Sequence, residues 1–259
     1  MGSSQSSVAT QAFGAHTNGL KSLLDTGEHA DLKLRCVDGR EFMVHKAIVC
    51  AQSEFFPKAC KPEKFKVGRS CTVGHRYQEQ PGQLSKASPQ VEGNEGVVEL
   101  TIGDATTIGF LLNFLYTMSY VDDIKAKSCL ITDVNLYIAA DFYAIETLKS
   151  VAAAGFQKHL TGGLWKTDSF PKALELIYND TFPEDRRLRD VALAVLLDNA
   201  SELIKFNSTV PTELTRVIES LPELSKDIAI QSLAQVQTLT SEIESLRRNA
   251  KKIELTATC

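Results

Sequence analysis

The fold of this chain is decided by residues 45–56, which read HKAIVCAQSEFF. Ahead of them, residues 31–37 alternate polar and apolar side chains, an Asp-Gly turn follows at 38–39, and residues 41–44 again have the character of a strand. The apolar positions of residues 46–60 follow helical spacing, so we expect one helix there. Two short strands followed by a helix predict the start of a small α+β domain.

The composition is that of a globular chain. It has 259 residues, of which 43% are hydrophobic and 23% charged, with a net charge of -4. The sequence contains no apolar run of the roughly 18 residues that a membrane span needs, and no strongly basic segment that would indicate nucleic acid as a partner. The Ser-rich start does not resemble a signal peptide and the cysteine spacing indicates free thiols, so we expect an intracellular protein, cytoplasmic and/or nuclear.

The reactive residue types form no recognisable chemical site. The six cysteines include no C-x-x-C pair, and no nucleophile stands at the spacing of a base and its orienting group. His45 has no such companion, so a structural histidine at the entry of a helix is expected there. The sequence predicts no enzyme, no bound metal and no cofactor.

Irregular and regular segments follow the first helix. Residues 63–95 are rich in Lys, Gly, Gln and Ser without periodicity, and they predict an unusually long loop. Residues 97–101 are a strand, and Asp104 is expected to cap a helix with apolar residues at i, i+3, i+4 and i+7. Further helices are expected over residues 132–142 and 145–159.

The two ends of the chain differ from this central part. Residues 1–25 are rich in Ser, Thr, Gln and Gly and predict a disordered tail. Residues 161–232 are expected to be a helical extension, in which the capping box Thr181-Phe182-Pro183-Glu184 opens a longer helix. Residues 233–259 are expected to form one heptad helix.

Apolar residues of this last helix are spaced alternately by three and four positions, as in the a/d seam of a coiled coil. The seam residues are Val236, Leu239, Ile243, Leu246, Ala250 and Ile253. About two and a half heptads dimerise only weakly alone. Two interpretations stay open: a coiled coil with another chain, or an amphipathic helix packed on its own domain.

Taken together, these motifs resemble the BTB/POZ family. Residues 45–56 are similar to the family's central signature, and Asp31-x-Lys33-Leu34 stands where the family has its first strand. Residues 110–120, FLLNFLYTMSY, resemble its next helix and turn, and residues 137–149 resemble its later helices. The helical part after Phe170 is similar to the extension of short fungal members. The resemblance implies a BTB/POZ fold over residues 26–160, with helices clustered around a small sheet.

The resemblance also implies a protein-interaction adaptor or scaffold that homodimerises through the first helix and its neighbours. A buried acid and base of the family's dimer interface correspond here to Asp31 and Lys46. The alternative from the residues alone is that Asp31 caps a local backbone group and Lys46 reaches solvent.

Many members of the family link a client protein to a cullin ubiquitin ligase, which makes a cullin and an unknown client the further expected partners. The candidate cullin-facing residues are Phe65, Phe110, Tyr116 and Tyr120. A cullin-independent scaffold or a transcriptional co-regulator is the alternative.

Residues 67–90 interrupt this resemblance. Joining Lys66 directly to Val91 restores a sequence that resembles the family's loop and strand, and the valine and glutamine at the boundaries fit intron-boundary codons. Either a retained intron or a genuine insertion explains the segment. Phe65-Lys66-Val67 also lacks the glutamate of the family's cullin-binding element, which weakens the cullin interpretation.

Overall fold

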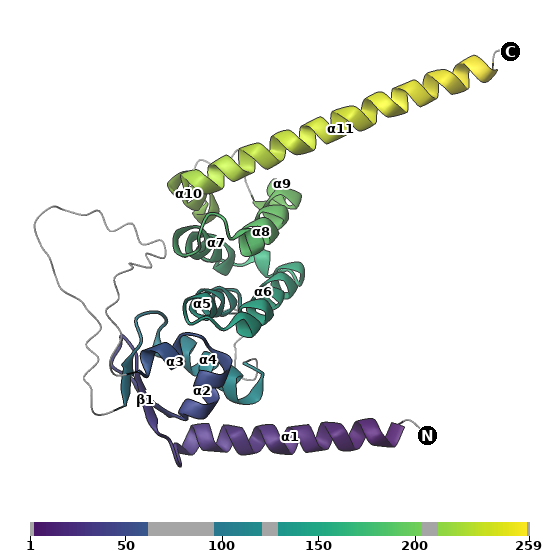
Figure 1. Ribbon diagram of the computed structural model, residues 1–259. Helices are drawn as coiled ribbons and strands as arrows, with labels where there is room; N and C mark the ends of the chain where they lie inside the picture. The colour runs from purple at the N-terminus through teal and green to yellow at the C-terminus, as the bar shows by residue number, and fades with distance from the viewer. Residues whose placement is uncertain (1–2, 62–95, 121–128, 204–211, 258–259) are drawn as a thin grey trace, which may run out of the picture.

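The computed structural model describes residues 3–61, 96–120, 129–203 and 212–257 (Figure 1). Three strands form one small sheet in the order β2-β1-β3, so β1 is central. It pairs antiparallel with β2 and parallel with β3. The strands are β1 (Leu32–Arg35), β2 (Glu41–Val44) and β3 (Val97–Glu99).

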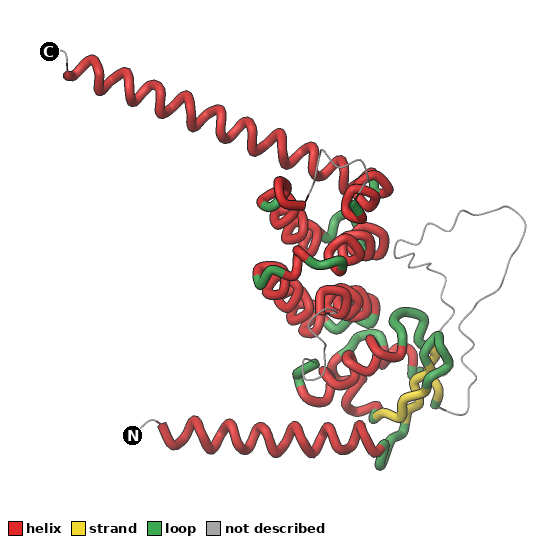
Figure 2. Tube along the Cα trace, turned by 180° about the vertical axis from the view of Figure 1, so that it is seen from behind, coloured by secondary structure: helices red, strands yellow, loops and turns green. Residues whose placement is uncertain are grey.

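Helices make up most of the rest. Figures 1 and 2 show α2, α3 and α4 beside the sheet, with α1 along one side of this group and the later helices stacked in pairs away from it. This arrangement confirms the predicted α+β fold followed by a helical extension. The helices are α1 (Ser3–Thr26), α2 (Lys46–Gln52), α3 (Phe56–Ala59), α4 (Ala105–Thr117), α5 (Cys129–Phe142), α6 (Glu146–Thr161), the 3-10 turn η2 (Leu164–Lys166), α7 (Ser169–Asp180), α8 (Arg186–Asp198), α9 (Ala200–Leu203), α10 (Glu213–Ser220) and α11 (Pro222–Ala257).

One core runs through the sheet and the stacked helices. Leu32 and Leu34 of β1 alternate inward with their polar neighbours and are buried, as the alternation in the sequence predicts. Asp104 accepts a hydrogen bond from the Thr107 N–H at 2.8 Å, so the predicted cap of α4 is confirmed.

The helix expected over residues 46–60 is broken in two. Ser53 ends α2 because its hydroxyl donates to the Tyr143 carbonyl at 2.6 Å and accepts the N–H groups of Phe55 and Phe56. The chain then restarts as α3, whose Phe56 stacks on the Tyr143 ring with centroids 5.8 Å apart. A side-chain hydrogen bond to a distant helix therefore overrides the local helical pattern.

The disordered tail expected over residues 1–25 is also wrong, because Ser3–Thr26 is helix α1. Leu20, Leu23 and Leu24 are half-buried against the core. Local composition predicted mobility, but burial of these three leucines favours the helix.

The start of α8 differs from the expected capping box. Thr181 donates its hydroxyl back to the Ile177 carbonyl at 2.6 Å, so it closes α7. Asp185 is the N-cap of α8 and accepts the Arg187 N–H. In the part of the chain that the structure describes, every helix is too short or too polar to span a bilayer.

Candidate interaction surfaces

The predicted pair Asp31 and Lys46 lies where β1 begins and α2 begins. The Asp31 carboxylate accepts the backbone N–H of Lys46 at 2.7 Å. Its negative charge therefore stands at the N-terminus of α2, where the helix dipole favours it. Asp31 is exposed, and among the described residues no ion pair joins the Lys46 ammonium to it. In the single chain the Asp31 carboxylate therefore caps a backbone group, as the alternative describes, and the charge pair of a dimer interface stays a prediction.

His45, which joins β2 to α2, has a structural role. Its Nε2 donates to the Glu28 carbonyl, and its Nδ1 shares a hydrogen bond with the Tyr116 hydroxyl, both at 2.7 Å. Because a carbonyl only accepts, Nε2 carries a proton. The Tyr116 hydroxyl in turn accepts the His45 backbone N–H at 2.9 Å. This network ties the end of α1 to α2 and α4, and it leaves the imidazole no free nitrogen for catalysis.

Two of the residues expected to face a cullin are buried instead. Tyr116 is 2% exposed and held by His45. Tyr120 is 3% exposed, and its hydroxyl donates to the Asp133 carboxylate at 2.9 Å. Both expectations are corrected because the ring of each tyrosine fills the core and its hydroxyl has a partner inside the protein. Phe65 lies outside the described residues, as does the whole segment 67–90.

The Asp133 carboxyl that receives Tyr120 is fully buried. His159 Nδ1 lies 2.6 Å from its second oxygen. Burial raises the pKa of Asp133, and the hydrogen bonds from His159 and Tyr120 oppose that rise. The sequence gives no signal for this group, because its members stand on different elements and meet only after α4, α5 and α6 have packed.

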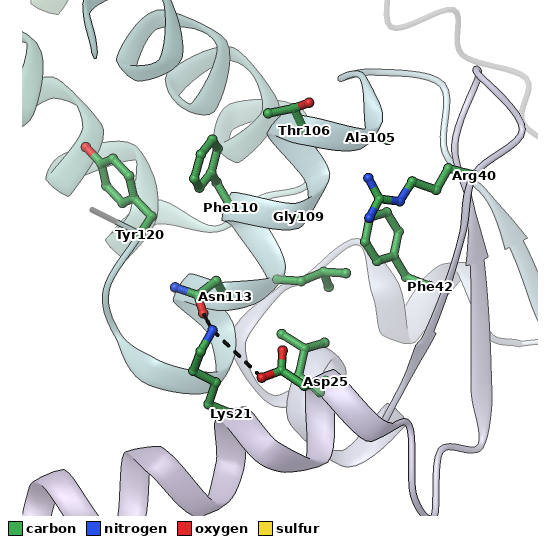
Figure 3. A pocket seen from close by; sticks show the side chains of 12 residues that line it. Lys21, Asp25, Arg40, Phe42, Ala105, Thr106, Gly109, Phe110, Asn113 and Tyr120 are labelled. Carbon is green, nitrogen blue, oxygen red and sulfur yellow. Dashed lines mark hydrogen bonds and ion pairs between the residues drawn. The ribbon is translucent and has the colours of Figure 1, made fainter. Parts of the chain in front are cut away.

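Phe110, the remaining cullin-facing candidate, lines a cleft between α1, α4 and the residues around the start of β2 (Figure 3). The cleft has a volume of about 620 Å³. Phe42 and Phe110 supply aromatic surface, and the Arg40 guanidinium lies 5.2 Å from the Phe42 ring. On the α1 side, Lys21 donates to Asn113 at 3.3 Å. An apolar floor with a charged rim is the chemistry of a protein-binding surface.

The second candidate surface is the predicted heptad seam on α11. The first turns of this helix are fixed by Arg189 to Glu223 at 2.9 Å and by Arg186 to Asp227 at 2.7 Å. Tyr178 also donates to Asp227 at 2.8 Å. Beyond these contacts the helix extends away from the other helices (Figures 1 and 2).

The large seam side chains that the structure describes are between 48% and 66% exposed: Val236, Leu239, Ile243 and Leu246. The alternative of a helix packed on its own domain is therefore wrong over this stretch. The side chain of Ile253 lies outside the described residues. Ile230 and Leu233 are also exposed, but with Val236 at position a they fall at positions b and e, outside the seam.

Nothing in the described parts of the chain indicates a chemical centre. No group of three potential metal-binding side chains comes together there. The described cysteines, Cys36, Cys50, Cys60 and Cys129, are not joined in disulfides. Burial raises the pKa of both Cys36 and Cys60 to about 11, so at neutral pH these two are protonated and weak nucleophiles.

A family model matches part of this arrangement. The model of the BTB/POZ domain matches residues 20–73, which include the end of α1, β1, β2, α2 and α3. No curated protein matches the chain.

Proposed function

The chain carries a BTB/POZ domain, a protein-interaction domain, and on that premise we propose that it is an adaptor that homodimerises through α1 and the start of α2. The length of α1 is the observation that carries this proposal. Its 24 residues extend beyond the helices that it covers (Figure 1), and three half-buried leucines near its end hold it to the core. Helix that lacks tertiary contacts is marginal in water, so a second copy would supply the missing contacts.

The exposed Asp31 and the half-buried Lys46 support the same site. Both lie beside the end of α1, and a dimer there would remove them from water. In such a dimer each carboxylate would need a cationic partner, which Lys46 can provide, because a buried charge without one is strongly destabilising.

The test is the mass of the full chain in solution by light scattering at micromolar concentration. We expect twice the 28.4 kDa of one chain. Ser22 is exposed on the face of α1 opposite its leucines, so Ser22→Arg should shift the mass toward one chain when it is made together with Leu246→Arg, which prevents the α11 seam from holding two chains together. Ser201→Arg makes the same change at an exposed serine of α9 and should leave the dimer intact. A wild-type mass of 28.4 kDa would contradict the proposal.

A cullin is the second candidate partner, and the position of Phe110 in the cleft favours it. Calorimetry against the N-terminal region of a BTB-binding cullin tests it with full-length protein and with a form that lacks residues 67–90. We expect binding that Phe110→Ala weakens and that Phe182→Ala, a change at an exposed aromatic residue elsewhere, does not. If neither form, with both folded, gives a heat of binding, the cullin proposal is refuted and the cullin-independent scaffold is favoured.

A further inference from the structure

We infer that α11 is a second self-association element, which pairs in parallel and in register with α11 of another copy of this chain. The proposal starts from how the helix is held. Leu224 is buried and Ile228 packs on the core, and both lie within the first two turns. The following stretch exposes an apolar stripe of large seam residues from Val236 to Leu246. Water is a poor partner for such a stripe, and a second helix of the same pattern covers it most simply.

The residue types along the seam favour two parallel strands. With Val236 at position a, the first two a positions are the β-branched Val236 and Ile243, and the first two d positions are Leu239 and Leu246. Ala250 and Ile253 continue the a and d series. β-Branched residues at a with leucine at d favour the parallel two-stranded coiled coil over trimers and tetramers.

The charges beside the seam set the same direction. Glu242 is at position g and Arg247 is at the following position e. In a parallel pair each g residue faces the next e residue of its partner, so Glu242 of each copy would meet Arg247 of the other. In an antiparallel pair g faces g and e faces e, so Glu242 would lie opposite Glu242 and Arg247 opposite Arg247, and these like charges would repel. Among the described residues, no ion pair within the chain occupies either side chain.

This pairing is distinct from the proposed BTB interface, because the two surfaces lie at opposite ends of the described structure (Figure 1). Its test must therefore report on α11 itself. Cysteine crosslinking does so, with Leu239→Cys and Leu246→Cys made separately in full-length protein in which Cys71 and Cys259 are replaced by serine. The crosslinked peptides are identified by mass spectrometry.

Both variants are expected to crosslink to themselves, with a several-fold excess over Ser241→Cys, which lies on the opposite face at position f. Positions seven residues apart are separated by about 10.5 Å along the helix, so both can self-pair only in a parallel, in-register dimer. Mixing the two variants should give little 239–246 product. A yield no higher than that of Ser241→Cys, or a dominant 239–246 product, would overturn the inference.

Charge variants made in the Leu239→Cys background test orientation independently. Glu242→Lys or Arg247→Glu alone places like charges across a parallel pair, so each should lower the crosslink yield several-fold. Mixing the two restores attraction at both sites and should restore the yield. Unchanged yields in the single variants would refute the parallel arrangement. If the protein has a mass of about 57 kDa, twice that of one chain, but shows no α11 crosslinks, this inference is refuted while the proposed BTB dimer is still supported.

Discussion

Arg189 holds the helical extension together, and its removal tests how the packing is stabilised. The side chain is 2% exposed. Its guanidinium donates to the carbonyls of Thr181 at 2.9 Å and Tyr178 at 3.3 Å, and it lies 4.6 Å from the Tyr178 ring. These carbonyls are at the C-terminal end of α7, where a cation also complements the helix dipole.

Arg189→Met keeps much of the apolar stem and removes the donors. A hydrogen bond from a charged donor contributes about 1.5–3 kcal/mol, and both carbonyls would lose theirs, so we expect a loss of about 3 kcal/mol in the free energy of unfolding. The ion pair with Glu223 adds little, because the Glu223 side chain is 57% exposed. Glu223→Gln should therefore cost less than about 1 kcal/mol.

Urea titration followed by circular dichroism measures both variants, and hydrogen exchange on α7 and α11 locates the loss. Equal stability losses for Arg189→Met and Glu223→Gln would refute the reasoning, because they would mean that the buried carbonyl bonds contribute nothing beyond the exposed ion pair.

Three further changes test other parts of the structure. Asp185 accepts hydrogen bonds from Lys149 at 2.8 Å and Tyr137 at 2.7 Å; burial alone would raise its pKa, but these bonds hold the pKa of Asp185 below its usual value. An aspartate whose pKa is lowered in the folded protein stabilises the fold at every pH above its unfolded pKa of about 3.9, so Asp185→Asn should be destabilising at pH 7. In thermal unfolding measured at decreasing pH, the stability difference between wild type and Asp185→Asn should shrink as the pH falls below about 3.9 and through the lower pKa of the folded state. Gly155→Ala would place its methyl 2.7 Å from the Tyr120 hydroxyl and 2.9 Å from the Asp133 carboxylate, so a loss of about 1–3 kcal/mol in chemical denaturation is expected, whereas Gly19→Ala, with nothing within 4 Å, should be neutral or stabilising. Asp31→Ala removes the hydrogen-bond acceptor at the start of α2 and should lower the free energy of unfolding by about 1 kcal/mol, measured at a protein concentration below the dissociation constant of the dimer. Lys46→Ala should lower it by less, and equal losses would support the ion-pair interpretation instead.

Regular local patterns in the sequence predicted most of the elements. The alternation at residues 31–37, the cap at Asp104 and the heptad spacing after Val236 each depend on neighbours within a few positions, and each has its expected structure. The break at Ser53 depends instead on the Tyr143 carbonyl, ninety residues away. Such a contact is invisible until α5 has packed on α2 and α3.

The candidate site was harder to predict than the fold. A motif places Tyr116 and Tyr120 on the right element but does not say whether a ring points to a partner or to the core, and both point to the core. The exposure of the α11 seam likewise depended on whether its own domain offers a complementary face. The anchoring of α11 through Arg186 and Arg189 sets that outcome, and neither residue belongs to the seam.

The stacking of the helix pairs has a mechanical consequence. Helices α10 and α11 contact α7 and α8, which contact α5 and α6, so each layer is stabilised by its immediate neighbours. In such an array, opening of the outermost layer removes support from the next layer only, and fraying proceeds stepwise from the free end. The α11 end can therefore loosen while the sheet, three layers away, keeps its shape, so that the C-terminal helices can open without unfolding the N-terminal part of the chain.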